Sequence, residues 1–248
     1  MRRRYLCGAL VGVLATAGVL AFGGLGSSAA VHRAAPNLRL GPIHMGSNST
    51  SSNWSGYAVT GSKFTSVSGS WTEPTVSCSG TAYSSFWVGL DGDTSSTVEQ
   101  TGTDADCSGS TPQYYAWYEM YPKFPVNLSQ PVSPGDKLSA SVTTDGRGNF
   151  TLTISDATKP WTYQTTARLK NAKLASAEVI AEAPSGSGGV LPLANFGTVS
   201  FSGATANGAT LTSSTPNLDE ITMASGSTVK AQPSSISNGA FSVAWKHS

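Results

Sequence analysis

The sequence predicts an all-β domain built as a sandwich of two antiparallel sheets. From Asn53 onwards, short runs of β-branched and aromatic residues are interrupted about every ten residues by Gly, Pro, Asn or Asp, a spacing typical of β-sandwiches. Six Trp residues favour a two-sheet core over a helical bundle, because each buries a large apolar area. We expect one domain, residues 53–248.

The strand pattern recurs along the whole of this domain. Residues 145–148, DGRG, separate two alternating runs and predict a hairpin turn, since Asp and Gly favour tight turns between strands. In chain order, the expected strands are residues 54–59, 67–73, 85–90, 98–100, 114–121, 138–143, 149–154, 162–168, 177–182, 199–201, 221–223 and 241–245.

An aromatic stretch at residues 114–122, YYAWYEMYP, is the most distinctive of these strands. Side chains alternate between the two faces of a strand, so one face carries Tyr115, Trp117, Glu119 and Tyr121. This face is therefore an aromatic wall with a single carboxylate. Taken alone, the stretch is equally consistent with a central strand whose tyrosines only pack, because aromatic residues are enriched in strands.

Residues 171–182, NAKLASAEVIAE, do not fit the β pattern by composition. Their Ala and Glu content favours a helix, whereas the all-β context and Pro184 favour a strand at the end of the segment. Glu178 and Glu182 share a face in either case, because a spacing of four residues satisfies both the helical and the strand period.

Residues 1–30 predict a secretory signal peptide. Arginines at positions 2–4 precede an apolar run over residues 5–25, and small residues at 28–30 follow, which is the order of regions in such signals. The Gly and Ala content favours removal over a retained membrane anchor. We expect cleavage after Ala30 and a secreted, extracellular protein without membrane attachment; residues 31–52 are expected to be a short pro-segment or flexible tail.

The charge of the mature chain gives no sign of a nucleic-acid partner. Without residues 1–30 the chain has 12 Lys and Arg against 14 Asp and Glu, a formal charge of −2. No basic patch with interleaved aromatic residues is present, as nucleic-acid binding would require. We expect a monomer whose partners are its substrates.

Two cysteines remain after removal of the signal, Cys78 and Cys107. In an exported chain such a pair predicts one disulfide bond. A metal site is the alternative, and it lacks histidines nearby.

Histidine placement excludes several kinds of active site. The three histidines, His32, His44 and His247, all lie in segments that resemble tails. This placement argues against a Ser-His-Asp or Cys-His nucleophile and against histidine-ligated zinc. We expect no metal and no cofactor, so an enzyme of this sequence must use carboxylates, amides or hydroxyls.

Several motifs, in this order, resemble the glutamic peptidases, also called eqolisins. Together they cover most of the mature chain. They are residues 53–59, NWSGYAV; residues 86–93, FWVGLDGD, with 98–102, VEQTG; residues 114–122; and residues 177–182, AEVIAE, followed by 193–197, LANFG.

The resemblance implies a fold and a set of site residues. The fold is a sandwich of two antiparallel sheets, a concanavalin A-like or lectin-like jelly roll, with a concave groove that binds polypeptide substrates. The implied catalytic pair is Gln100 and Glu182. The substrate-binding residues implied by the same motifs are Trp87, Asp91, Trp117 and Glu119, with Glu178 as a neighbour of the pair.

Strand alternation agrees with these assignments without using the family. Trp87 and Asp91, Trp117 and Glu119, and Glu178 and Glu182 each form a pair with even spacing, so each pair is expected on one strand face. Three strands could then present aromatic and acidic side chains to one groove.

The chain departs from the family pattern at three positions. Val179 stands where the family usually has an aromatic residue, and Ala181 stands where it has Val or Ile. Tyr115 stands where fungal members often carry Asp, so one groove acid is expected to be missing.

The expected chemistry is peptide hydrolysis in acid. One carboxylate takes a proton from water and passes it to the departing amine, while the amide of Gln100 donates hydrogen bonds to the developing oxyanion. Such an endopeptidase would be insensitive to chelators and to serine-directed reagents. Residues 93–95, DTS, match the triplet of an aspartic protease, but the chain has no second such triplet to share a proton with it.

Two other functions fit an aromatic sandwich face. A carbohydrate-binding module would stack sugars on Trp and Tyr. A glycoside hydrolase would use two carboxylates, for example Glu119 and Glu182. Loss of peptide cleavage on replacement of Gln100 would exclude both, because neither needs that amide.

Overall fold

The computed structural model describes residues 49–248, and every regular element in this part of the chain is a β-strand. The predicted signal peptide, and residues 31–48 of the predicted tail, lie outside the described residues. Within the described range there is no helix with the length and apolar character needed to cross a membrane.

The folded domain includes residues ahead of Asn53, the expected boundary. Strand β1 (Thr50–Ser51) pairs in parallel with β16 (Leu218–Ser225). The Ser49 amide and hydroxyl both donate to the Asp219 carboxylate, at 3.0 and 2.7 Å. Residues 49–52 are therefore anchored to the domain, in contrast to the expected flexible tail.

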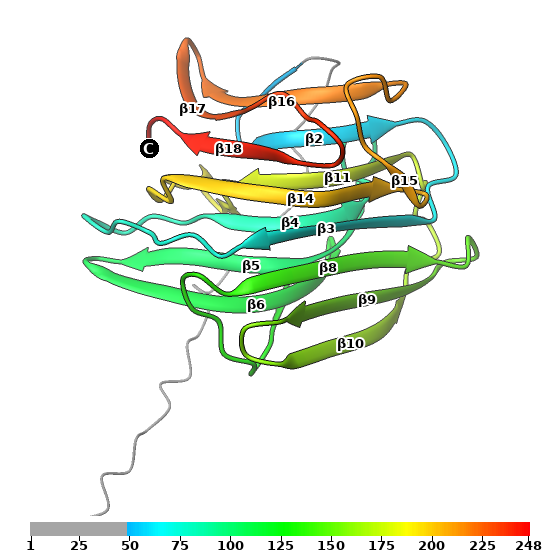
Figure 1. Ribbon diagram of the computed structural model, residues 1–248, viewed down its shortest axis with the longest axis horizontal. Coiled ribbons are helices and arrows are strands. Elements are labelled where there is room, and N and C mark those ends of the chain that lie inside the picture. The colour runs from blue at the N-terminus through cyan, green and yellow to red at the C-terminus, as the bar shows by residue number, and fades with distance from the viewer. Residues whose placement is uncertain (1–48) are drawn as a thin grey trace, which may run out of the picture. The chain divides into compact units, whose positions relative to one another are not determined.

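The strands form two stacked half-sheets that are joined through the pairing of β17 with β16 (Figure 1). The first half-sheet runs, in spatial order, β10 (Trp161–Arg168), β9 (Asn149–Asp156), β8 (Lys137–Thr144), β3 (Ser66–Thr72), β14 (Thr198–Ala206), β18 (Phe241–Trp245) and β17 (Thr228–Pro233). The second continues with β16, β2 (Trp54–Thr60), β11 (Ser176–Glu182), β4 (Ser85–Leu90), β5 (Val98–Ser108), β6 (Thr111–Tyr121) and β7 (Val126–Asn127). Short strands β12 (Ser185–Gly186) and β13 (Gly189–Val190) pair with each other, and β15 (Ala209–Thr210) pairs with β14.

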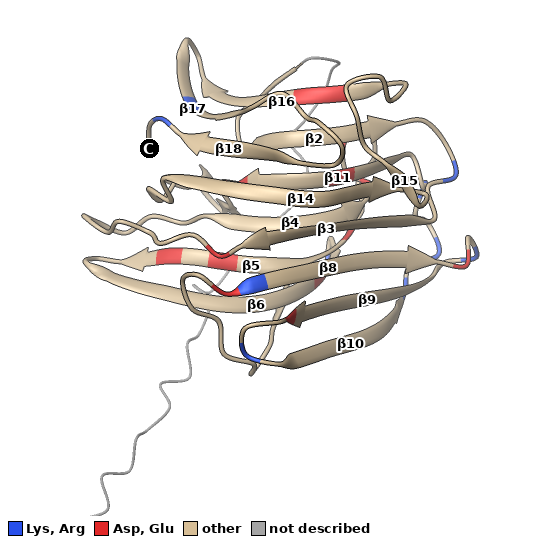
Figure 2. Cartoon of the chain, viewed as in Figure 1, with Lys and Arg blue, Asp and Glu red and all other residues tan. Residues whose placement is uncertain are grey.

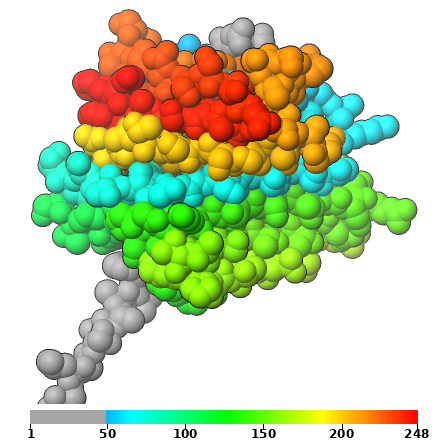
Figure 3. Space-filling view, viewed as in Figure 1, coloured from blue at the N-terminus to red at the C-terminus, as the bar shows by residue number. Residues whose placement is uncertain are grey.

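The main core lies between the two half-sheets. It includes Leu138 and Phe150 of the first and Phe86 and Val88 of the second, all almost fully buried. In Figure 1, β3, β8 and β14 overlie β4, β5 and β11, and in Figure 3 the first half-sheet forms a continuous surface towards the viewer. The predicted sandwich of two antiparallel sheets is confirmed.

The second half-sheet has a separate apolar cluster on its other face. Every residue of β4 and β11 is buried, whereas β8 and β9 alternate between buried and more exposed positions. We call this other face of the second half-sheet the site face. Its buried apolar residues are Trp54, Ala58, Trp87, Val98, Tyr115, Trp117, Ile180 and Ile221.

The strands of the second half-sheet are acidic and have no basic residues. Three acids lie on β5, two each on β11 and β16, and one on β6, while none of the strands from β16 to β7 contains Lys or Arg. Figure 2 shows the acidic positions on β5 and β16, in contrast to the uncharged strands β3, β14 and β18. Few cations are thus available to neutralise carboxyl groups on this half-sheet.

All the predicted strands are present, although several are longer than expected. Strand β5 continues to Ser108 rather than ending at residue 100, because residues 101–108 pair with β6 along their whole length. The helix-prone segment ends in β11, which is paired on both sides by β2 and β4. These long-range ladders outweigh the local preference. Strand β17 and the two-residue strands β1, β7, β12, β13 and β15 were not predicted.

Two local predictions are also confirmed. Residues 145–148 connect β8 to β9 as a hairpin. Cys78 and Cys107 form a disulfide with their α-carbons 5.4 Å apart. This bond joins the end of β5 to the segment between β3 and β4.

Gly102 offers a test of how closely β4 and β5 approach. A β-carbon at this position would lie 2.2 Å from the Phe86 carbonyl oxygen and 2.6 Å from the Trp87 β-carbon. We expect Gly102→Ala to lower the free energy of unfolding by about 1–3 kcal/mol, the usual cost of overpacking. Urea denaturation measures this, with Gly80→Ala as the control because its added carbon meets nothing within 4 Å. Equal stability of the two variants would contradict the close approach.

Candidate active site

Strand register brings most of the predicted site residues onto the site face. Residues paired across neighbouring strands point to the same face, and β11, β4, β5 and β6 are neighbours in this order. Three rows result: Glu178, Gly89, Gln100 and Glu119; Ile180, Trp87, Gly102 and Trp117; Glu182, Ser85, Asp104 and Tyr115.

Glu182, at the end of β11, accepts hydrogen bonds at both carboxylate oxygens. Trp87 Nε1 donates to Oε2 at 2.8 Å and Asn53 Nδ2 donates to Oε1 at 3.1 Å. The Ala183 amide also donates to the Asn53 carbonyl at 2.8 Å, which ties the end of β11 to the start of β2. N–H donors of this kind stabilise negative charge on a buried carboxylate.

Gln100 is oriented by Glu119, its register partner on β6. Gln100 Nε2 donates to Glu119 Oε2 at 2.7 Å, and both residues are fully buried. The amide nitrogen carries two hydrogens, and one of them makes this bond. Glu119, predicted to bind substrate, thus contacts the predicted catalytic glutamine directly.

Gln100 and Glu182 share a face but not a row. They are offset by four residues along the strands, about 13 Å, and by two strand spacings, about 10 Å. Trp87 occupies part of this interval: its Nε1 bonds Glu182, and its Cζ3 lies 2.8 Å from the place where a β-carbon of Gly89 would be. The Gln100 β-carbon lies 3.2 Å from the same place. One indole therefore extends from Glu182 towards Gln100.

Asp91 does not continue the face of Trp87, contrary to the expectation from spacing. Strand β4 ends at Leu90, and Asp91 has a positive φ of 66°. Its carboxylate accepts the backbone amides of residues 173, 174 and 175 at 2.8 to 2.9 Å. Asp91 thus anchors the segment that leads into β11.

An acidic cluster that sequence reasoning missed lies at the end of the site face that carries Glu182. The Tyr115 hydroxyl is 2.7 Å from Asp104 Oδ2 and 2.6 Å from Asp106 Oδ2, and Trp117 Nε1 donates to Asp104 Oδ1 at 2.6 Å. The even spacing of Gln100, Asp104 and Asp106 would have indicated a shared face, had the strand been predicted beyond residue 100. At Tyr115, where a groove acid is expected to be missing, the hydroxyl contacts the Asp106 carboxyl.

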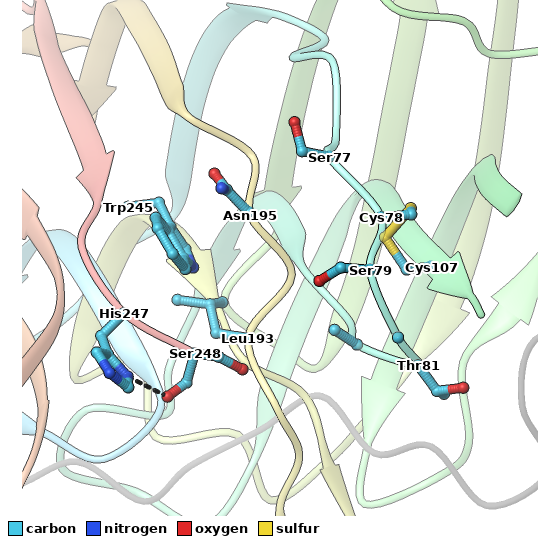
Figure 4. A pocket seen from close by; sticks show the side chains of 12 residues that line it. Ser77, Cys78, Ser79, Thr81, Cys107, Leu193, Asn195, Trp245, His247 and Ser248 are labelled. Carbon is cyan, nitrogen blue, oxygen red and sulfur yellow. Dashed lines mark hydrogen bonds between the residues drawn. A yellow bond between two sulfur atoms is a disulfide. The ribbon is translucent and has the colours of Figure 1, made fainter. Parts of the chain in front are cut away.

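A pocket of about 510 Å³ lies apart from these residues, next to the disulfide and the chain's C-terminus (Figure 4). Its lining includes Ser77, Cys78, Leu193, Asn195 and Trp245. None of the predicted catalytic or substrate-binding residues lines it. Across residues 49–248, no group of His, Cys, Asp and Glu side chains is arranged to hold a metal ion.

Comparison with known proteins identifies the family. The sequence profile of the peptidase A4 family matches residues 52–245. The chain belongs to the peptidase A4 family. The resemblance to glutamic peptidases is thereby confirmed.

Two curated relatives and one solved structure illustrate the similarity of this A4 peptidase. Aspergillopepsin-2 of Aspergillus niger is 29% identical over 184 residues, 63% of this chain and 64% of that protein. Scytalidopepsin B of Scytalidium lignicola is 41% identical over 105 residues, 41% of this chain and 39% of that protein. The chain thus spans less than two thirds of either relative. The crystal structure of scytalido-glutamic peptidase with a transition state analog inhibitor aligns with a TM-score of 0.70 at 27% identity, covering 79% of this chain and 98% of that one.

Several carboxyl groups of this member of the peptidase A4 family favour the protonated state. Burial, and then the charges of Asp93, Asp91 and Glu99, raise the pKa of Glu178 well above its ordinary value. Burial also raises the pKa of Glu99 to about 9 and that of Glu73 to about 8. These groups therefore hold their protons in acid while the chain is folded.

Glu73 tests the consequence for stability. The unfolded chain loses this proton near the ordinary pKa of 4.5, whereas the folded chain keeps it up to about 8. Its stabilising contribution is therefore complete below pH 4.5 and is lost as pH rises through about 8, at up to about 1.4 kcal/mol per pH unit. Glu73→Gln should flatten the fall in unfolding free energy over this window, as measured by urea denaturation.

Glu220→Gln is the matched control for this measurement. Glu220 is partly exposed, so the same substitution there controls for the loss of one carboxyl group that is not fully buried. The same pH dependence in wild type and Glu73→Gln would contradict the buried proton.

Proposed function

We propose that this A4 peptidase is a secreted endopeptidase that hydrolyses polypeptides in acid, with Glu182 as general base and acid and Gln100 as oxyanion stabiliser. The observation that supports it best is their joint position on the site face, each oriented by a hydrogen-bonded neighbour. Glu182 is held by Trp87 and Asn53, and Gln100 by Glu119. The solved scytalido-glutamic peptidase with a peptide based transition state analog supports a peptide as the substrate.

The proposed reaction uses only side chains of the chain itself and a water molecule. The Glu182 carboxylate takes a proton from the water as its oxygen attacks the peptide carbonyl carbon. The side-chain amide of Gln100 donates to the carbonyl oxygen as it becomes negative, which requires the substrate-bound site to bring Gln100 and Glu182 closer together than their offset in the sheet. Glu182 then gives its proton to the amine nitrogen, and the C–N bond breaks.

The surroundings of the two glutamates on β11 support Glu182 as the base. Glu178 is level with Gln100 in the sheet, so register alone would favour it. However, burial and nearby acids raise the pKa of Glu178, and a protonated carboxyl cannot accept a proton from water. Two N–H donors hold Glu182, an arrangement that suits a carboxylate.

The proposed secretion depends on the sequence of residues 1–30. The proposed substrate-binding role of Trp87 and Trp117 depends on the resemblance to the family. The glycosidase alternative would require Glu119 as a free acid or base. Glu119 instead accepts the amide of Gln100. That contact fits a glutamine that must be oriented for peptide hydrolysis.

Replacement of the pair should abolish peptide cleavage. We expect Glu182→Gln to lower kcat for casein digestion by about 10² to 10⁴-fold, the usual contribution of a general acid–base. Gln100→Ala should lower it by about 10² to 10³-fold, the usual effect of losing an oxyanion donor. Wild-type activity should be highest in acid and resist chelators. Glu220→Gln is the control, and digestion by Glu182→Gln at the control's rate would refute the assignment.

A second comparison separates the two glutamates. A protonated carboxyl and an amide are both neutral, so Glu178→Gln should lower kcat at least about tenfold less than Glu182→Gln at the same acid pH. Single-turnover kinetics with a short peptide would measure both. The reverse order would transfer the base to Glu178.

A further inference from the structure

In the cluster of Asp104, Tyr115 and Asp106, one hydroxyl group contacts two carboxyl groups. The Tyr115 oxygen lies within hydrogen-bond distance of both Asp104 Oδ2 and Asp106 Oδ2, at 2.7 and 2.6 Å. A phenol has a single hydrogen to donate. If both carboxyl groups were ionised, one of these contacts would bring two lone pairs together in a buried site, where such repulsion is costly.

A proton on one carboxyl group resolves the conflict. That carboxyl then donates to the phenol oxygen, and the phenol donates to the other carboxylate. Both short contacts, at 2.7 and 2.6 Å, then are hydrogen bonds of ordinary O–H···O length. The geometry therefore requires at least two hydrogens among these three groups.

The other contacts assign the retained proton to Asp106. Asp104 accepts a further N–H from Trp117 at 2.6 Å, which suits the ionised member. Asp106 accepts only the Ser84 amide besides the phenol, at 3.1 Å. Burial raises the pKa of Asp104 to about 6 and, with the charge of Asp104 and Glu73, raises the pKa of Asp106 well above its ordinary value.

Among residues 49–248, the titratable groups around Asp106 include no cation that could hold its charge. From β5 and β6 it is faced by Asp104 and Tyr115, from the end of β3 by Glu73, and from the segment before β4 by Tyr83. Strands β4, β5 and β6 contain no Lys, Arg or His. A proton is therefore the available means of neutralising this carboxyl.

We propose that Asp106 and Tyr115 are positioning residues for substrate binding, which act through a proton-sharing chain from Asp106 through Tyr115 and Asp104 to the indole of Trp117. Trp117 lies level with Trp87 across Gly102, which has no side chain between them. The chain of hydrogen bonds thus holds one of the two indoles that flank the centre of the site face. The proposed effect on substrate binding rests on the proposed peptidase activity. The proton shared between Asp106 and Tyr115 does not depend on that activity.

Kinetics of two variants test the positioning role. Tyr115→Phe breaks the chain, so we expect the KM for a peptide to rise about tenfold, the effect of one hydrogen bond, while kcat changes less than about threefold. Asp106→Asn keeps a neutral donor to the phenol and should retain the wild-type KM, whereas Asp106→Ala should resemble Tyr115→Phe. An unchanged KM in Tyr115→Phe would overturn the proposal, as would a tenfold rise in Asp106→Asn.

Infrared spectroscopy tests the proton without any substrate. A protonated-carboxyl absorption at neutral pH should be present in the wild type and weaker by one group in Asp106→Asn, and Glu73→Gln should remove a different component. If wild type and Asp106→Asn give the same band, Asp106 holds no proton and the inference fails. If the band behaves as expected but casein is not digested, the proposed function fails and the proton-sharing cluster stands. Near-ultraviolet circular dichroism verifies that each variant is folded.

Discussion

Burial of carboxyl groups in a half-sheet whose strands contain no Lys or Arg is the constraint on which this structure depends. The strands of the second half-sheet contain acids but no Lys or Arg, and an isolated buried charge costs several kcal/mol. The structure offsets the cost of burying these carboxyl groups in two ways. Glu182 and Asp91 accept N–H donors, whereas Glu178 and Asp106 favour protonation through burial and neighbouring acids.

The two solutions have different consequences for chemistry and for stability. A carboxylate held by donors is prepared to accept a proton from water, as the proposed role of Glu182 requires. A carboxyl that depends on its proton makes the fold sensitive to rising pH, because the unfolded chain releases that proton more readily. The same half-sheet thus links the proposed acid chemistry to stability in acid. Gly89 leaves room for the indole of Trp87, and Gly102 allows the close approach of β4 and β5.

Within single strands, the sequence was a reliable guide. Alternation predicted the shared face of Trp117 and Glu119, and the even spacing of Glu178 and Glu182 put both on one face whichever structure the segment adopted. The pairing of Cys78 with Cys107 followed from cysteine number alone. The motifs also indicated the family that the profile match established. These properties are local or compositional, and they need no knowledge of neighbouring strands.

Which residues meet across the sheet was decided only by the tertiary structure. The sequence by itself determined the all-β class, the strand faces and the residue types of the site. The tertiary structure extended β5 through Asp106, turned Asp91 away at a positive φ, and placed Glu178 rather than Glu182 level with Gln100. The physical reason is that strand periodicity arises within a few residues, whereas strand order, register and the desolvation of each carboxyl depend on partners far away in the chain.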